Sequence, residues 1–521
     1  MSESPQVPNI ARAGGIMVAS LFLSRVLGFV RDMVITAKFG QNALTDAYIV
    51  SFQVPDLLFY LIAGGALSSA FIPVFSEYLH TGRDDDAWHV FSVVVTVMSA
   101  VVLVFIAFAW YYAVPLVHLV APDIPDSSVP LVAHMSRIIV PAQYAFFIGG
   151  IMLGTLYARQ VFSVPGLAPN VYNIGIIVGA LVVSNVVVPG VVGMSWGALV
   201  GAFVGNIFIP LLVIRKLGVR FKLSFDTKHE GVRKVFKLML PVVLGLSLPG
   251  VFVIIIRYFA SSYPVGVVSA LDFGNRLMQA PLGVFGQALA LAAFPALSQF
   301  YAQKNMQMFS DQLSRSLRQV LFLTVPVAVL FVVVPLPIVQ AMYQRGEFTA
   351  EDALRTARAL QMFGIGVAAW CLHPLLMRAY FSVQKTWPPV LMGTLTTGLF
   401  VGAAALLVGT DYTMLALAAS VAAVFLALLM LFSVHATVTA LDLSGLGATF
   451  VKGLVASSVA AALAWGALRL LDGWDGGVAN FGLLLVLLIV VLVYAWVYYF
   501  AAKLLKMPET ETIARAMKRG R

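Results

Sequence analysis

The chain has little charge. Only 11% of its 521 residues are charged, whereas 60% are hydrophobic, and the mean hydropathy is +0.94. So few charged side chains cannot cover the surface of a soluble particle of this size. The composition therefore excludes a soluble globular protein and indicates an integral membrane protein.

Cysteine, metal-site motifs and a signal-peptide cleavage site are also scarce or missing, and each excludes a further feature. A single cysteine, Cys371, excludes an internal disulfide bond. The seven histidines lack the spacing of a metal site, so neither a metal nor another cofactor is expected. Arg12 precedes an apolar run as in a signal peptide, but Arg25 interrupts that run and no A-x-A cleavage site follows. We therefore expect a retained first membrane span.

Long apolar runs are abundant. A membrane-spanning helix needs about 20 mostly apolar residues, and fourteen stretches qualify. The sequence thus predicts an all-α polytopic membrane protein. The expected spans are 14–39, 48–78, 87–114, 129–158, 169–188, 191–214, 235–261, 265–302, 317–342, 353–383, 389–408, 414–441, 448–471 and 481–505.

The basic residues predict the orientation in the membrane. Seven of them lie between the sixth and seventh expected spans and an eighth lies at the start of the seventh, against two acidic residues, which marks this connection as cytoplasmic. By counting spans, both termini are then cytoplasmic. The net charge of +10 is explained by such connections and by anionic lipid, so no nucleic-acid partner is expected. The eight residues are Arg215, Lys216, Arg220, Lys222, Lys228, Arg233, Lys234 and Lys237.

An internal repeat divides the chain. Asp46-x6-Gln53-x-Pro55 recurs as Asp272-x6-Gln279-x-Pro281, and Pro73-x-x-Ser76-x-Tyr78 is echoed by Pro295-x-x-Ser298-x-Phe300. Chance similarity of short patterns in an apolar chain is the alternative explanation. A true repeat predicts an N-terminal lobe of spans 1–6 (1–222), a C-terminal lobe of spans 7–12 (223–443), and an appended part with spans 13 and 14 and a basic tail (444–521). Six spans per lobe imply a parallel repeat around a shared cavity, the usual frame for alternating access.

Charged residues inside the first span are candidates for function. Arg25, Arg31 and Asp32 lie within an apolar stretch, where one charge costs about 2.5 to 3.5 kcal/mol even on the lenient scales. Arg25 and Asp32 are seven residues apart, so a helix places them on one face with Gly28 between them. We expect these side chains to face a polar cavity and to hold an anion.

Further charges lie in other expected spans. Arg276 follows Asp272 by four residues, and we expect it to face the cavity rather than to form a structural ion pair. Arg257 lies near the end of the seventh span, where it either faces the cavity or snorkels outward. Asp46 lies just before the second span, and we expect it to neutralise one of the first-span arginines.

Several motifs together resemble a known family. They are Ser24-Arg-Val-Leu-Gly-Phe-Val-Arg-Asp32, Thr45-Asp46-Ala47-Tyr48, Phe162-Ser-Val-Pro165-x3-Pro169 with Asn173, Asn275-Arg276-Leu277 and Arg345-Gly346-x-Phe348-Thr349. This set is similar to the bacterial lipid II flippase family, MurJ or MviN, of the multidrug/oligosaccharidyl-lipid/polysaccharide exporter superfamily. The resemblance extends over 19–348, and fourteen spans with an appended pair also match that family.

The resemblance implies a transporter rather than an enzyme. Members flip lipid II, the undecaprenyl-diphosphate-linked peptidoglycan precursor, from the inner to the outer leaflet of the bacterial cytoplasmic membrane. By the same resemblance Arg25, Arg31 and Arg276 match cavity arginines, and Asp32 and Asp46 match acidic positions. Guanidinium groups suit this cargo because they bind phosphate oxygens with paired, charge-assisted hydrogen bonds. The expected partners are lipid II and membrane lipids, and the expected state is a monomer.

The sequence departs from the family in two respects. Many members carry an arginine pair in the second span, where this chain has Leu58-Phe59-Tyr60, so we hypothesise that Arg257 supplies the missing positive charge. The eleventh expected span, 389–408, contains no carboxylate or asparagine, which disfavours the sodium coupling of some relatives. Coupling to the membrane potential, worth about 2.3 kcal/mol per charge per 100 mV, or to another ion is the alternative drive.

Other functions remain open at this point. A related exporter of another lipid-linked oligosaccharide, or a multidrug antiporter, would share the two-lobe frame, although a cation exporter should have a more acidic cavity. A membrane enzyme acting on prenyl diphosphates would need paired carboxylates for a divalent metal. The acidic run Asp84-Asp85-Asp86 is instead expected to be a solvated loop.

Overall fold

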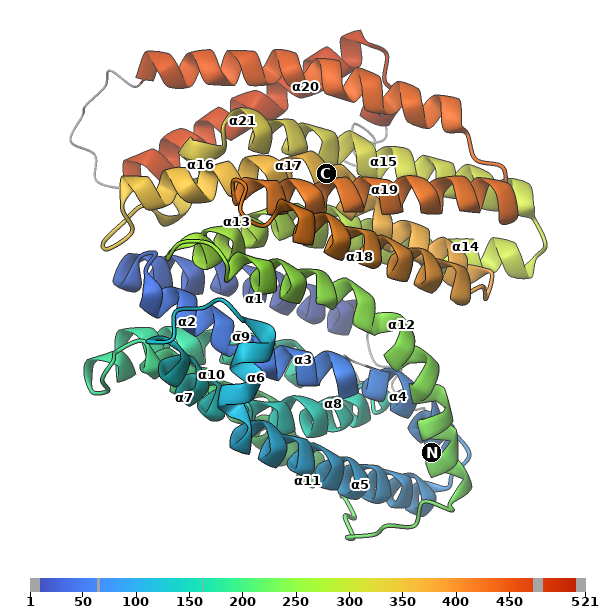
Figure 1. Cartoon of the computed structure of the whole chain (residues 1–521). Helices are drawn as coiled ribbons and strands as arrows, with labels where there is room; N and C mark the ends of the chain where they lie inside the picture. The colour runs from blue at the N-terminus through green and yellow to red at the C-terminus, as the bar shows by residue number, and fades with distance from the viewer. Residues whose placement is uncertain (1–9, 63–65, 162, 472–480, 512–521) are drawn as a thin grey trace. The chain divides into compact units, whose positions relative to one another are not determined.

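The computed structural model describes residues 10–62, 66–161, 163–471 and 481–511. Throughout these residues the regular secondary structure is helical (Figure 1). Among the described residues, eleven helices are long and apolar enough to cross a membrane, and they overlap eleven of the fourteen expected spans. The prediction of an all-α polytopic membrane protein is confirmed.

The chain divides into two compact units, with the boundary between Ile254 and Ile255, inside α12. The expected boundaries at 222 and 443 stay predictions. Unit 1 contains α1 (Ile10–Phe39), α2 (Ala43–Ser51), α3 (Gln53–Ile62), α4 (Ala66–His80), α5 (Asp84–Tyr111), α6 (Ala113–Val120), α7 (Val129–Ile139), α8 (Ala142–Ala158), α9 (Ser163–Leu181), η1 (Val183–Asn185), α10 (Val192–Phe203), η2 (Val204–Phe208), α11 (Ile209–Lys216) and most of α12 (Glu230–Ala260).

Unit 2 begins with the last turns of α12. It continues with α13 (Val267–Pro281), η3 (Leu282–Gly286), α14 (Gln287–Ala302), α15 (Met306–Val333), α16 (Pro335–Tyr343), α17 (Ala350–Ser382), α18 (Trp387–Leu407), α19 (Thr413–Thr437), α20 (Leu443–Leu471) and α21 (Phe481–Leu504). The segments η2 and η3 are π-helical turns, and η1 is a 3₁₀ turn. The expected span 317–342 is divided between α15, which already begins at Met306, and α16.

The expected second span, 48–78, is not one helix but is distributed over α2, α3 and α4. Proline explains the first interruption. Pro55 has no N–H to donate to the carbonyl of Ser51, which an uninterrupted helix requires. That carbonyl instead accepts a hydrogen bond from the hydroxyl of Ser136 on α7, at 2.9 Å. The chain thus exchanges a bond within the helix for one between helices.

Glycine brings α9 and α10 of unit 1 into close contact. A Cβ built on Gly197 of α10 would lie 2.9 Å from the Cα of Gly179 on α9. Any larger residue would therefore force the two backbones apart. Small residues at helix crossings in membranes allow this approach and the dispersion contacts that come with it. The helix α9 in turn packs along α1, and so it connects α1 to the rest of unit 1.

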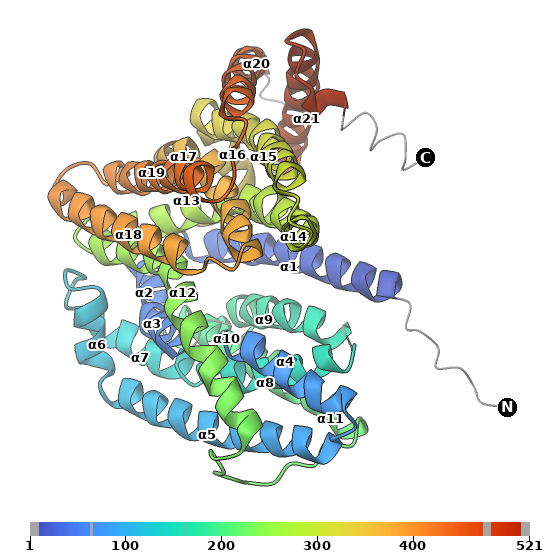
Figure 2. The ribbon, with the colours of Figure 1, turned by 90° about the vertical axis from the view of Figure 1, so that its right-hand side faces the viewer.

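In unit 2, α17 packs against α13, α15 and α19, whereas α20 packs against α15, and α21 packs against α20 and α16 (Figures 1 and 2). The attachment of α21 is specific. Pro326 lies inside α15 and cannot donate to the carbonyl of Phe322. The hydroxyl of Tyr498 on α21 donates to that carbonyl, and the hydroxyl of Tyr494 donates to the carbonyl of Pro326, both at 2.7 Å.

Candidate functional site

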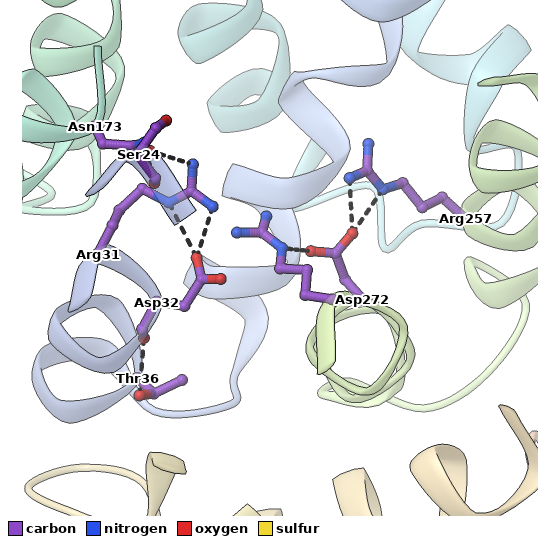
Figure 3. Close-up of polar contacts among 8 residues, drawn as sticks. Ser24, Arg31, Asp32, Thr36, Asn173, Arg257 and Asp272 are labelled. Atoms are coloured by element: carbon purple, nitrogen blue, oxygen red, sulfur yellow. Dashed lines mark hydrogen bonds and ion pairs between the residues drawn. The ribbon is translucent and has the colours of Figure 1, made fainter. Parts of the chain in front are cut away.

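The guanidinium group of Arg31 is held from two directions in unit 1 (Figure 3). Its Nε and Nη2 donate to Oδ1 of Asp32 at 3.0 and 2.8 Å, and its Nη1 donates to Oδ1 of Asn173 at 3.0 Å. The side chain of Asp32 is 4% exposed and that of Arg31 is 19% exposed. The carboxylate is therefore sequestered, while the guanidinium keeps an accessible edge.

The packing of α9 against α1 explains this geometry. Asn170 and Asn173 lie one turn apart on α9, and their amides donate to the carbonyls of Ser20 and Ser24 on α1, at 3.3 and 3.2 Å. Side-chain amides suit this role because they donate to one backbone while accepting from another group. The side-chain amide of Asn173 therefore bonds both to Arg31 and to the backbone of α1, the helix that carries Arg31.

Asn173 was absent from the site residues proposed above. The sequence did contain signals for it, since Asn173 belongs to one of the motifs of the family resemblance, and Asn170 and Asn173 are polar residues at helical spacing in an apolar run. What the sequence does not contain is the identity of the partner helix. The distance in sequence between Arg31 and Asn173 is 142 residues.

Arg25 and Asp32 do not share an environment, although they share a helical face by spacing. Arg25 is exposed, whereas Asp32 is buried. Gly28, between them, borders open space, because a Cβ built there meets no described atom within 4 Å. Asp46 is buried on α2. Its expected neutralisation of a first-span arginine stays a prediction.

Unit 2 contains a second cluster, in which Arg257 and Arg276 both bond to Asp272 (Figure 3). Arg257 donates from Nε and Nη2 to Oδ1 at 3.0 and 2.7 Å, and Arg276 donates from Nε to Oδ2 at 2.6 Å. Helical spacing of four residues explains the pairing of Asp272 with Arg276. The short connection between α12 and α13 brings Arg257 to the same carboxylate.

Two expectations differ from this arrangement. Arg257 does not snorkel outward, because it is 9% exposed and paired with Asp272. Arg276 forms an ion pair with Asp272, which we did not expect, and 25% of its side chain remains exposed. The reason is the same in both cases: a buried carboxylate requires positive partners, and Asp272 lies within reach of two.

The prediction that the acidic run 84–86 forms a loop is wrong. Asp84, Asp85 and Asp86 form the first turn of α5 rather than a loop. Their carboxylates are well exposed and favourable at a helix N-terminus, and Asp85 forms an ion pair with Arg220. In the described part of the chain, no three histidine, cysteine, aspartate or glutamate side chains are grouped so as to hold a metal ion.

Both clusters are suited to binding an anion. In each, an aspartate inside an apolar helix orients an arginine, which remains partly accessible. An arginine held in place in this way loses less conformational entropy when it binds a phosphate or carboxylate. In both units, therefore, an oriented positive charge lies within an apolar helix.

Comparisons with known proteins show which proteins this chain is similar to. The family model "Lipid II flippase MurJ" matches residues 35–505. A probable lipid II flippase MurJ of Vibrio cholerae is 29% identical over 413 residues, covering 75% of this chain and 76% of that protein. The lipid II flippase MurJ of Burkholderia cenocepacia is 28% identical over 390 residues, covering 73% and 75%.

Solved structures are similar in fold. A lipid II flippase MurJ in an inward closed conformation has a TM-score of 0.77 at 22% identity, covering 94% of this chain and 98% of that chain. An inward-facing MATE multidrug transporter has a TM-score of 0.66 at 12% identity, covering 81% and 98%. At these identities both similarities bear on the fold alone.

Proposed function

The chain belongs to the lipid II flippase MurJ family, and from this premise we propose that it carries lipid II from the inner to the outer leaflet of the bacterial cytoplasmic membrane. The observation that carries the proposal is the family match over residues 35–505, which includes Asn173 and the cluster around Asp272 but begins just after Arg31 and Asp32. The protein then supplies the precursor for peptidoglycan synthesis, and with it for cell-wall growth and cell shape.

The chemistry of the cargo supports the role of the arginines. A diphosphate and peptide carboxylates are anionic groups that hydrocarbon excludes. Arg31 and Arg276, each oriented by an aspartate, are our proposed ligands for the diphosphate, with Arg25 as an additional, exposed cation. Guanidinium groups match phosphate oxygens in geometry as well as charge. Asp32 and Asp46 are proposed as the supporting acidic residues.

The proposed mechanism is alternating access without covalent chemistry. Binding and release of the headgroup on opposite sides require conformational change but no catalytic nucleophile and no cofactor. Movement of charge across the membrane potential, or coupling to an ion, is the proposed drive. The protein is proposed to act as a monomer, with both termini in the cytoplasm, since its most basic connection follows α11.

Depletion of the protein in its own organism tests this function. We expect lipid II to accumulate in the inner leaflet, as measured by its accessibility to an externally added probe. Wild-type protein should restore outer-leaflet lipid II, and Arg31→Met should not. A matched control is Arg355→Met, which removes an arginine that pairs with exposed Glu351 in unit 2.

The control variant should restore transport as well as wild type. Unchanged outer-leaflet lipid II after depletion, in a strain lacking any other flippase, would refute the proposal. Transport of another lipid-linked oligosaccharide or of cationic drugs under the same conditions would instead support a related exporter.

A further inference from the structure

Asp272 holds two arginines at once, and it does so without competition between them. Arg257 bonds to Oδ1, whereas Arg276 bonds to Oδ2. Each oxygen of a carboxylate accepts more than one hydrogen bond, so both arginines occupy favourable positions. The three side chains form one network, in which a change at Arg257 reaches Arg276 through the carboxylate.

Exposure increases along this network. The side chain of Asp272 is 2% exposed, that of Arg257 is 11% exposed and that of Arg276 is 25% exposed. Arg257 is therefore the more deeply buried of the two arginines. A negatively charged ligand approaching from the accessible side reaches Arg276 more readily than it reaches Arg257.

The charges explain why a second arginine is needed. If Asp272 had Arg276 as its partner without Arg257, the pair would carry no net charge and would attract an anion less strongly than the three-residue cluster does. With Arg257, two guanidinium groups and one carboxylate carry a net charge of +1. Burying an arginine in an apolar helix costs free energy, and a buried ion pair is poor evidence for a stabilising role.

We propose that Arg257 is a positioning residue: it neutralises Asp272, so that Asp272 orients Arg276 without cancelling its charge toward the substrate diphosphate. This inference rests on the proposed function. It replaces the hypothesis that Arg257 itself compensates for the missing second-span arginine by contacting the substrate. Asp272, which the sequence suggested only as a neighbour of Arg276, becomes the centre of the cluster.

A pair of substitutions separates positioning from direct contact. Arg257→Met leaves Asp272 to cancel the charge of Arg276, so the affinity of the purified, full-length protein for lipid II should fall about tenfold. Adding Asp272→Asn removes the cancelling carboxylate. The double variant should then recover affinity to within about threefold of wild type. A residue with a merely structural role would not produce this recovery.

The controls keep the test decisive. Thermal unfolding of the purified protein, in the detergent used for the binding measurement, checks that each variant is folded. If Arg257→Met does not fold, Arg257→Lys takes its place with the opposite expectation, because a lysine keeps the charge and should retain most of the affinity. Arg355→Met with Glu351→Gln removes an i,i+4 ion pair elsewhere in unit 2 and should leave affinity unchanged.

Unfavourable results would be of two distinguishable kinds. A double variant that binds no better than Arg257→Met would overturn the positioning role, and so would Arg257→Lys with affinity as poor as that of Arg276→Met. If Arg276→Met and Arg31→Met both leave lipid II binding unchanged in folded protein, the proposed function of the clusters fails instead.

Discussion

The hydroxyl of Tyr498 is predicted to stabilise the attachment of α21 to α15. It is buried and donates to the carbonyl of Phe322, which Pro326 leaves without a partner inside α15. Tyr498→Phe removes the donor and leaves a buried carbonyl without a hydrogen bond. Such a group costs about 1 to 3 kcal/mol, and we expect the free energy of unfolding to fall by that amount.

A second substitution makes the reasoning sharper. Pro326→Ala restores an N–H that donates to the carbonyl of Phe322 within the helix. In that background Tyr498→Phe no longer orphans the carbonyl, and its cost should fall to under about 1 kcal/mol. The two effects are therefore coupled, and a double-mutant cycle measures the coupling.

Unfolding of the purified protein in mixed detergent micelles, followed by tryptophan fluorescence, measures these differences. Tyr499→Phe is the matched control, since Tyr499 neighbours Tyr498 on α21 but is partly exposed. It should change stability little. Equal costs of Tyr498→Phe with and without Pro326 would refute the account, because the cost would then not arise from the freed carbonyl.

Two further predictions concern packing and pH. Gly197→Ala should destabilise unit 1 by about 1 to 3 kcal/mol by separating α9 from α10, whereas Gly398→Ala, at a position open to 4 Å, should not; thermal unfolding compares them. The N–H of Gly445 and the hydroxyl of Ser444 bond to Asp442, and they lower the pKa of that carboxyl below its ordinary value of 3.8. The ionised carboxylate therefore stabilises the fold at pH values above 3.8. This stabilisation is lost as the pH falls through the lower pKa of the folded state. Asp442→Asn should therefore flatten the acid side of the stability profile, and an unchanged profile would contradict this.

Much of the fold follows from one-dimensional patterns. A run of apolar residues long enough to span a membrane forms a helix because the bilayer offers its backbone no other hydrogen-bond partners. In the part of the chain that the structure describes, eleven expected spans meet that criterion. The second span was expected to be one helix although it contains Pro55, and the donor to the carbonyl that Pro55 frees could not be predicted, since Ser136 lies 85 residues away.

The candidate site, too, could be predicted from the sequence only in part. Composition and helical spacing were sufficient to identify Arg25, Arg31, Asp32 and Arg276 as charges inside apolar helices, and the pairing of neighbours such as Arg31 with Asp32 is local. The tertiary structure alone decided that Asn173 holds Arg31 and that Asp272 holds Arg257. Pairings between helices depend on the rotation of each helix about its axis and on its neighbour. The hydropathy pattern predicts neither the rotation of a helix nor its neighbour, because all faces of a buried apolar helix have a similar hydropathy.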